Sequence, residues 1–131
     1  MGCSQSDTVV NPNTVLKILH FNDVYEIEER KPNGDPNQVL AGAARFVTAM
    51  EQHGLSKKLV LFSGDMFGPS NLSSHFKGEQ MIEVYKRLKV QVSCLGNHDT
   101  DFGLAKMSEL IEKTKTPWLM SNLFIGTETI G

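Results

Sequence analysis

The stretch Val90-Gln91-Val92-Ser93-Cys94-Leu95-Gly96-Asn97-His98-Asp99 decides the fold, because a run of strand length that is mostly apolar stops abruptly in a polar cluster. Two earlier runs have the same form: residues 15–21 end in Asn22-Asp23, and residues 59–63 end in Gly64-Asp65. Short runs rich in apolar and β-branched residues, closed by turn residues, are typical of strands. The sequence therefore predicts three strands that each end in metal-binding types of side chain.

Helical patterns separate these predicted strands. Apolar residues recur at three- and four-residue spacing over residues 38–53, 79–88 and 103–115. Gly54 and Pro117 stand where the first and third of these helices would stop, and residues 118–123 form a fourth apolar run. The alternation βαβαβαβ predicts an α/β fold with mainly parallel strands.

The carboxyl ends of parallel strands open on one edge of a sheet, where open α/β folds bind ligands. Asp23, Asp65 and the cluster from Asn97 to Asp99 can therefore converge despite their distance in sequence. Carboxylate and amide oxygens with a nearby imidazole suit a divalent cation held beside a phosphate. The pattern predicts a metal-dependent phosphoesterase site at the strand C-termini.

Composition narrows the partners. The chain has 131 residues and a net charge of −2, with Lys and Arg dispersed along it, so nothing indicates binding to nucleic acid. We therefore expect small-molecule or protein partners, and the predicted phosphoesterase site favours a small phosphate ester. Cys3 and Cys94 are far apart in sequence, without the spacing of a metal or redox motif, which argues against a disulfide and favours a reducing compartment such as the cytoplasm.

The N-terminus begins Met1-Gly2-Cys3-Ser4-Gln5-Ser6, which matches the pattern for N-myristoylation at Gly2. Cys3 beside it is a natural palmitoyl acceptor, and two acyl chains anchor a protein more stably than one. We expect residues 1–13 to form a flexible, lipidated tail and the protein to be cytoplasmic and membrane-associated. The alternative is a polar tail without modification.

Each candidate residue also has a plainer interpretation. Asp23 and Asp65 could be turn residues after strands, and Asn97 suits a left-handed turn after Gly96. Asp101 could cap the helix that begins near residue 103. His98 could be a surface histidine. His75 and the polar segment 26–37 are expected to lie in loops.

Three motifs carry a family resemblance: Ile18-Leu19-His20-Phe21-Asn22-Asp23-Val24-Tyr25, Phe62-Ser63-Gly64-Asp65, and Gly96-Asn97-His98-Asp99-Thr100-Asp101-Phe102-Gly103. Together they resemble the calcineurin-like metallophosphoesterases, and within them the N-terminal catalytic domain of the 5′-nucleotidase group, over about residues 15–125. The run Trp118-Leu119-Met120-Ser121-Asn122 also resembles a strand of that group.

The resemblance implies roles for the matching positions. Asp23 would ligate a first metal ion, Asp65 would bridge two, and Asn97 would bind the second. The cofactors would be two divalent ions such as Mn²⁺, Mg²⁺ or Zn²⁺, used to hydrolyse nucleotide phosphomonoesters. His98 would be the catalytic histidine, with Asp101 orienting its ring.

The chain departs from the family pattern in two ways. The family commonly has Asp-x-His after the first strand, whereas this chain has Asp23-Val24-Tyr25; a phenol is a much poorer ligand than imidazole at neutral pH. Later histidines of the family, its second half-domain and its nucleotide-binding domain have no counterpart. Residues 14–131 are therefore expected to be the N-terminal part of such a domain, and the alternative is a truncated or catalytically silent membrane-tethered binding module.

Overall fold

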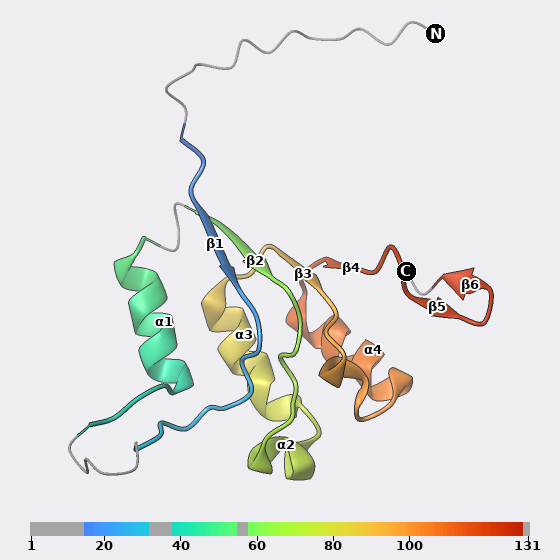
Figure 1. The fold of residues 1–131 in the computed structure, drawn as a ribbon, viewed down its shortest axis with the longest axis horizontal. Coiled ribbons are helices and arrows are strands. Elements are labelled where there is room, and N and C mark those ends of the chain that lie inside the picture. The colour runs from blue at the N-terminus through green and yellow to red at the C-terminus, as the bar shows by residue number, and fades with distance from the viewer. Residues whose placement is uncertain (1–14, 32–37, 55–57, 130–131) are drawn as a thin grey trace, which may run out of the picture.

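A parallel sheet organises the molecule. The computed structural model describes residues 15–31, 38–54 and 58–129. The sheet has four strands in chain order, each parallel to its neighbour: β1 (Ile18–Phe21), β2 (Leu59–Phe62), β3 (Val92–Cys94) and β4 (Trp118–Leu119) (Figure 1). The predicted α/β fold with parallel strands is confirmed.

Helices connect the strands. They are α1 (Ala43–Gln52), α2 (Asn71–Phe76), α3 (Ile82–Leu88) and α4 (Leu104–Thr114), with two short 3-10 helices, η2 (Glu79–Met81) and η3 (His98–Thr100). A small antiparallel hairpin follows the sheet, formed by β5 (Phe124–Ile125) and β6 (Glu128–Thr129). The first three strand ends each lead into a loop and then a helix, which is the arrangement that exposes loop side chains at one edge.

The core lies between the sheet and its helices. Val60 and Phe62 of β2 are buried together with Tyr85 and Leu88 of α3. The Trp118 ring of β4 stacks on the Tyr85 ring with a centroid separation of 5.8 Å, which continues the apolar layer across the sheet. The packing of this apolar layer holds the strands in position, and the polar residues follow at their carboxyl ends.

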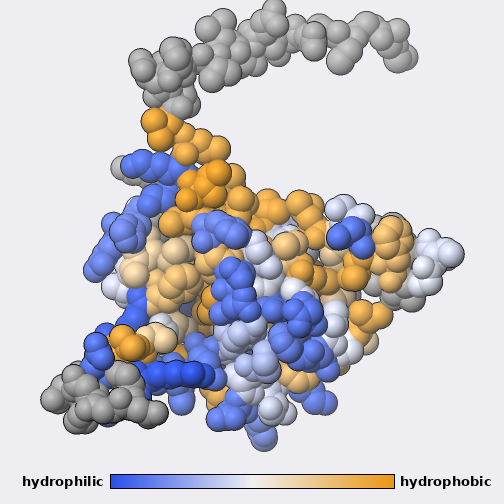
Figure 2. Space-filling view, viewed as in Figure 1, coloured by the Kyte–Doolittle hydropathy of each residue, from blue (hydrophilic) through white to orange (hydrophobic). Residues whose placement is uncertain are grey.

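The other face of the sheet is apolar and open. Ile18 of β1 is 51% exposed and Leu119 of β4 is 61% exposed. Figure 2 shows apolar surface around the start of β1, where Val15 and Leu16 are also exposed. Alternate residues of β1 thus divide between a covered and an uncovered face, as the period of a strand requires.

The first helix begins later than the sequence predicted. Residues 38–42 are not helical: Leu40 pairs with Arg30 through two backbone hydrogen bonds, with N···O distances of 2.7 and 2.8 Å. Ala41 and Gly42 have positive φ angles of 58° and 94°, which an α-helix excludes. The helix therefore begins at Ala43, and the prediction of a helix from residue 38 was wrong at that end.

Helix α2 was missed. Ser70 and Ser73 cap it reciprocally: the Ser73 amide donates to Ser70 Oγ at 3.0 Å, and the Ser70 amide donates to Ser73 Oγ at 2.7 Å. Such a short helix with serine in place of Glu or Gln has little hydrophobic periodicity to reveal it. His75 consequently lies in a helix, and its assignment to a loop was wrong.

The fourth predicted strand was too long. Only Trp118–Leu119 pairs with β3, and residues 124–129 form the hairpin that no sequence signal had indicated. The predicted helix over residues 79–88 divides into η2 and α3. None of these differences moves the ends of β1, β2 and β3.

Some predictions fall outside the described residues. Gly2 and Cys3, the predicted lipidation sites, belong to residues 1–14, and residues 32–37 of the predicted polar loop are likewise outside. Within the described ranges, no helix is long and apolar enough to cross a membrane.

Candidate active site

The ends of β1 and β2 bring two aspartates together. Beyond the strands, the Asp23 amide donates to the Gly64 carbonyl and the Val24 amide donates to the Asp65 carbonyl, both at 3.1 Å. Asp23 and Asp65 both adopt left-handed backbone conformations, with φ angles of 57° and 65°. They are therefore turn residues, as their plainer interpretation predicted, and the same turns place their carboxylates at the edge of the sheet.

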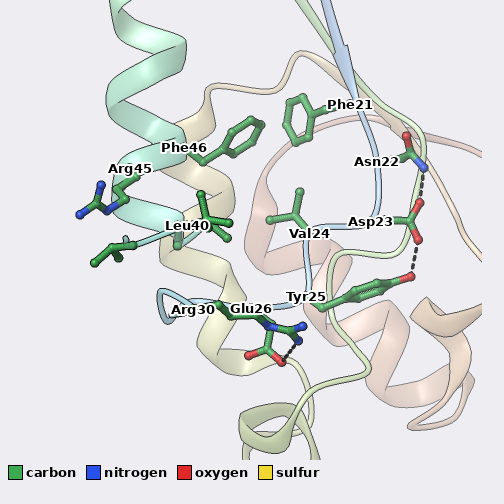
Figure 3. Close-up of a pocket in the computed structure, with 14 residues that line it drawn as sticks. Phe21, Asn22, Asp23, Val24, Tyr25, Glu26, Arg30, Leu40, Arg45 and Phe46 are labelled. Carbon is green, nitrogen blue, oxygen red and sulfur yellow. Dashed lines mark hydrogen bonds and ion pairs between the residues drawn. The ribbon is translucent and has the colours of Figure 1, made fainter. Parts of the chain in front are cut away.

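Tyr25 joins the two carboxylates. Its hydroxyl donates to Oδ1 of Asp23, and it lies 3.2 Å from Oδ2 of Asp65, to which it also donates. Figure 3 shows the phenol reaching back to Asp23, whose other carboxylate oxygen accepts from Asn22 Nδ2. The hydrogen bond to Asp23 and the neighbouring negative charges raise the pKa of the Tyr25 phenol well above its usual value, so the hydroxyl keeps its proton.

Asp99 holds the ends of β2 and β3 together from within. It is 1% exposed, and its carboxylate accepts from the backbone amides of Asp65 at 2.8 Å, Met66 at 2.9 Å, Phe67 at 3.2 Å and Gly96 at 2.9 Å. Burial raises the pKa of this carboxyl, and the four amides act in the opposite direction. The carboxylate fixes the turn that presents Asp65.

Sequence reasoning assigned no role to Asp99, although it lies within the quoted motif. The available signal was its place three residues after Gly96 in a turn, since Asp side chains at turns often accept from nearby backbone amides. Three of its four partners come from a segment more than thirty residues earlier in the chain, so the sequence alone could not name them.

The β3 end carries a histidine and aspartate pair. His98 Nδ1 lies 2.8 Å from Asp101 Oδ2, and the hydrogen bond raises the pKa of His98 above its ordinary value. The His98 backbone amide donates to Asp65 Oδ1 at 2.8 Å. Its ring meets the Tyr25 ring edge-on, with centroids 6.2 Å apart. His98 therefore contacts Asp65 directly, and it contacts Tyr25, which donates to Asp23.

Two of the plainer interpretations do not hold. Asn97 has a φ angle of −69°, so it is not the left-handed residue of this turn. The N-cap of α4 is Gly103, without a side-chain cap, and the Asp101 carboxylate binds His98. Asn97 is exposed at the same loop, directly before His98.

The model of the family described as calcineurin-like phosphoesterase matches residues 16–131. The chain belongs to this family. All the site residues described above lie within the matched range.

Relatives within the calcineurin-like phosphoesterases include nucleotidases. The chain is 30% identical over 117 residues to the snake venom 5′-nucleotidase of Naja atra, covering 82% of this chain and 22% of the relative. It is 28% identical over 116 residues to the 5′-nucleotidase of Homo sapiens, covering 82% and 20%. The chain thus spans about a fifth of the length of these relatives.

A solved nucleotidase structure shares the fold. The NAD nucleotidase of Haemophilus influenzae superposes with a TM-score of 0.70 at 26% identity, covering 82% of this chain and 23% of that one. The resemblance stated from the three motifs is confirmed at the level of family and fold.

This family implies divalent metal cofactors, and the donors present fit one such ion. Asp23 and Asp65 converge on a single point, now taken by the Tyr25 hydroxyl, and hard oxygen donors suit Mg²⁺ or Mn²⁺. In the described part of the chain, no group of three or more His, Cys, Asp or Glu side chains could hold a metal ion. These donors therefore do not by themselves form the two-metal centre that the resemblance implies.

A cavity lies beside the end of β1 in the described part of the chain. It has a volume of about 650 Å³ and opens between the β1 end and α1. Figure 3 shows Phe21, Val24, Leu40 and Phe46 gathered on that side, whereas Asp23 and the Tyr25 hydroxyl point away from it. Asn22, Asp23 and Tyr25 nevertheless also line this cavity, so it borders the candidate site.

Proposed function

We propose that this chain forms the N-terminal part of the catalytic domain of a phosphoesterase that hydrolyses nucleotide phosphomonoesters. The observation that carries the proposal is the linked set of hydrogen bonds from Asp23 through Tyr25 and Asp65 to His98 and Asp101. The family supports phosphoester hydrolysis, and the names of the relatives support a nucleotide as substrate.

The proposed roles follow from the chemistry of each group. His98 is partly exposed and hydrogen-bonded by Asp101, which favours the imidazolium form. An imidazolium at this edge can stabilise negative charge on a phosphoryl oxygen or protonate a leaving oxygen. Asp101 acts through His98, because it fixes the ring orientation and supports its charge.

Asp23, Asp65 and Asn97 are the proposed ligands of a divalent cation. Such a cation polarises a phosphoryl oxygen when bound. The two-cation mechanism that the family resemblance implies stays a prediction.

A phosphate-release assay tests this function. The full chain is incubated with AMP and Mn²⁺, and the same reaction is run with Asp65→Asn and His98→Asn. Turnover that both substitutions abolish is the expected result. His53→Asn is the matched control, because His53 caps the C-terminus of α1, which leads to the opposite end of β2. Turnover unaffected by His98→Asn would exclude the proposed role of the histidine.

A second function is favoured by one observation. The Tyr25 hydroxyl already satisfies both carboxylates, which suits a module that binds a nucleotide or protein partner without catalysis. Binding of AMP detected by titration, with no phosphate release under any divalent cation, would favour this candidate over the enzyme.

Membrane attachment is a separate proposal that rests on Gly2 and Cys3 of the sequence. Mass spectrometry of the N-terminal peptide from the native-terminus protein is expected to show a myristoyl group on Gly2 and a palmitoyl group on Cys3. The result that would contradict the proposed cytoplasmic, membrane-associated location has two parts: all of the protein is found in the soluble fraction, and its N-terminal peptide carries no acyl group.

A further inference from the structure

Tyr25 occupies the position where the two candidate carboxylate ligands meet. Its hydroxyl oxygen is hydrogen-bonded to Asp23 Oδ1 and lies 3.2 Å from Asp65 Oδ2. The Asp65 side chain has little freedom to move away, since it is 7% exposed and its other oxygen accepts from the His98 amide at 2.8 Å. The point between the carboxylates is therefore defined mainly by Asp65 and filled by the phenol.

A hydroxyl and a divalent cation need the same oxygens. The phenol carries one proton that it shares between two carboxylates, and hydrogen bonds to ionised acceptors are stronger than those between neutral groups. A cation ligated by both Asp23 Oδ1 and Asp65 Oδ2 would lie at the point that the Tyr25 hydroxyl now fills. The hydroxyl and the cation cannot occupy this point at once, so a cation bound there must displace the Tyr25 hydroxyl.

We propose that the Tyr25 hydroxyl competes with a divalent cation for the Asp23 and Asp65 carboxylates, and that Tyr25 thereby sets the cation affinity of the site. The inference rests on the proposed function only in taking these carboxylates as cation ligands. It differs from the resemblance, which treats position 25 as the place of a metal ligand.

Calorimetric titration of Mn²⁺ into the full chain tests the competition. Tyr25→Phe keeps the ring and removes the hydroxyl, and is expected to bind Mn²⁺ roughly tenfold more tightly, because no charge-assisted hydrogen bond has to be broken. Tyr85→Phe is the matched control: it removes the other tyrosine hydroxyl, which is buried against Ser93, and should leave Mn²⁺ affinity unchanged. Circular dichroism of each variant confirms that it is folded.

Each possible result of the Mn²⁺ titration either supports or overturns the proposed competition. Weaker Mn²⁺ binding by Tyr25→Phe would show that the phenol is a ligand, and would overturn the proposal. Equal affinity of Tyr25→Phe and the unmodified chain, or no binding by either, would also overturn it. Tighter binding by Tyr25→Phe without phosphate release from AMP would support the competition while the proposed enzymatic function fails.

Discussion

The two halves of the site are built differently. On one half, the loops after β2 and β3 are joined by Asp99, which lies inside the protein and accepts from four backbone amides. On the other half, after β1, Asp23 is exposed and its carboxylate accepts from the side chains of Asn22 and Tyr25. A carboxylate that binds buried backbone fixes geometry, whereas exposed side-chain bonds can be exchanged for a ligand.

This contrast assigns different tasks to the halves. The β2 and β3 half is preorganised, because its turn, its aspartate and its histidine are set by the fold. The β1 half is adjustable, and its chemistry depends on the residue at position 25. Substitution of the buried Asp99 in the first half should therefore cost mainly stability, and substitution of Tyr25 in the second should change mainly binding.

Asp99→Ala is the largest expected effect. It leaves four backbone amides of the β2 and β3 loops without their acceptor, and removing such buried partners costs at least about 3 kcal/mol of unfolding free energy. Denaturant unfolding monitored by circular dichroism measures it. Asp101→Ala, which removes an exposed carboxylate from the same loop, is the control and should cost below about 1 kcal/mol. Equal losses would remove the basis for calling the first half preorganised.

Gly64→Ala comes next. Gly64 has a φ angle of 96°, and a Cβ there would collide with the backbone of Gly96 in the neighbouring loop. Gly54→Ala is a matched control, because Gly54 has a φ angle of 74° and, among the described residues, no atom within 4 Å of the added carbon. A positive φ angle alone costs alanine roughly 1 to 2 kcal/mol of unfolding free energy in both variants. The collision adds to this cost only at Gly64, so Gly64→Ala should lose about 1 kcal/mol more than Gly54→Ala. The difference in denaturation midpoint reports the contact between the two loops.

Much of this arrangement was readable in the sequence, because strand ends are marked by a change from apolar to polar residues. The convergence of Asp23 and Asp65 followed from parallel strands alone. The alternation of side chains along the chain also placed Tyr25 on the same side as Asp23, where its hydroxyl is found.

What could not be predicted depends on contacts between distant segments or on backbone geometry. The role of Asp99 rests on amides of residues 65–67, which no local pattern identifies. Helix α2 is held by a reciprocal serine cap on six residues with weak periodicity. The late start of α1 follows from two positive φ angles that the sequence before Ala43 did not predict.

Tyr25→Phe should leave the fold almost unchanged. Tyr25 lies in the β1 half of the site and its hydroxyl bonds only to the side chains of Asp23 and Asp65, so the unfolding free energy is expected to change by less than about 1 kcal/mol. Chemical denaturation of the metal-free protein measures this. A loss as large as that of Asp99→Ala would mean that the β1 half is as rigidly built as its neighbour, and the contrast would disappear.

The smallest expected effect concerns the charge of His98. Its pKa is raised chiefly by the hydrogen bond that the imidazole makes to the Asp101 carboxylate, so Asp101→Asn should lower the pKa toward the ordinary histidine value. Because the folded pKa lies above the unfolded one, the pair stabilises the fold fully below the unfolded pKa, and this contribution is lost as pH rises through the folded pKa. NMR titration of the histidine ring protons measures the shift, and the His53 signals should be unaffected by the substitution. An unchanged His98 pKa in Asp101→Asn would mean that Asp65 and Asp23 hold the imidazolium instead, and the adjustable half of the site would then share in setting the charge of the preorganised one.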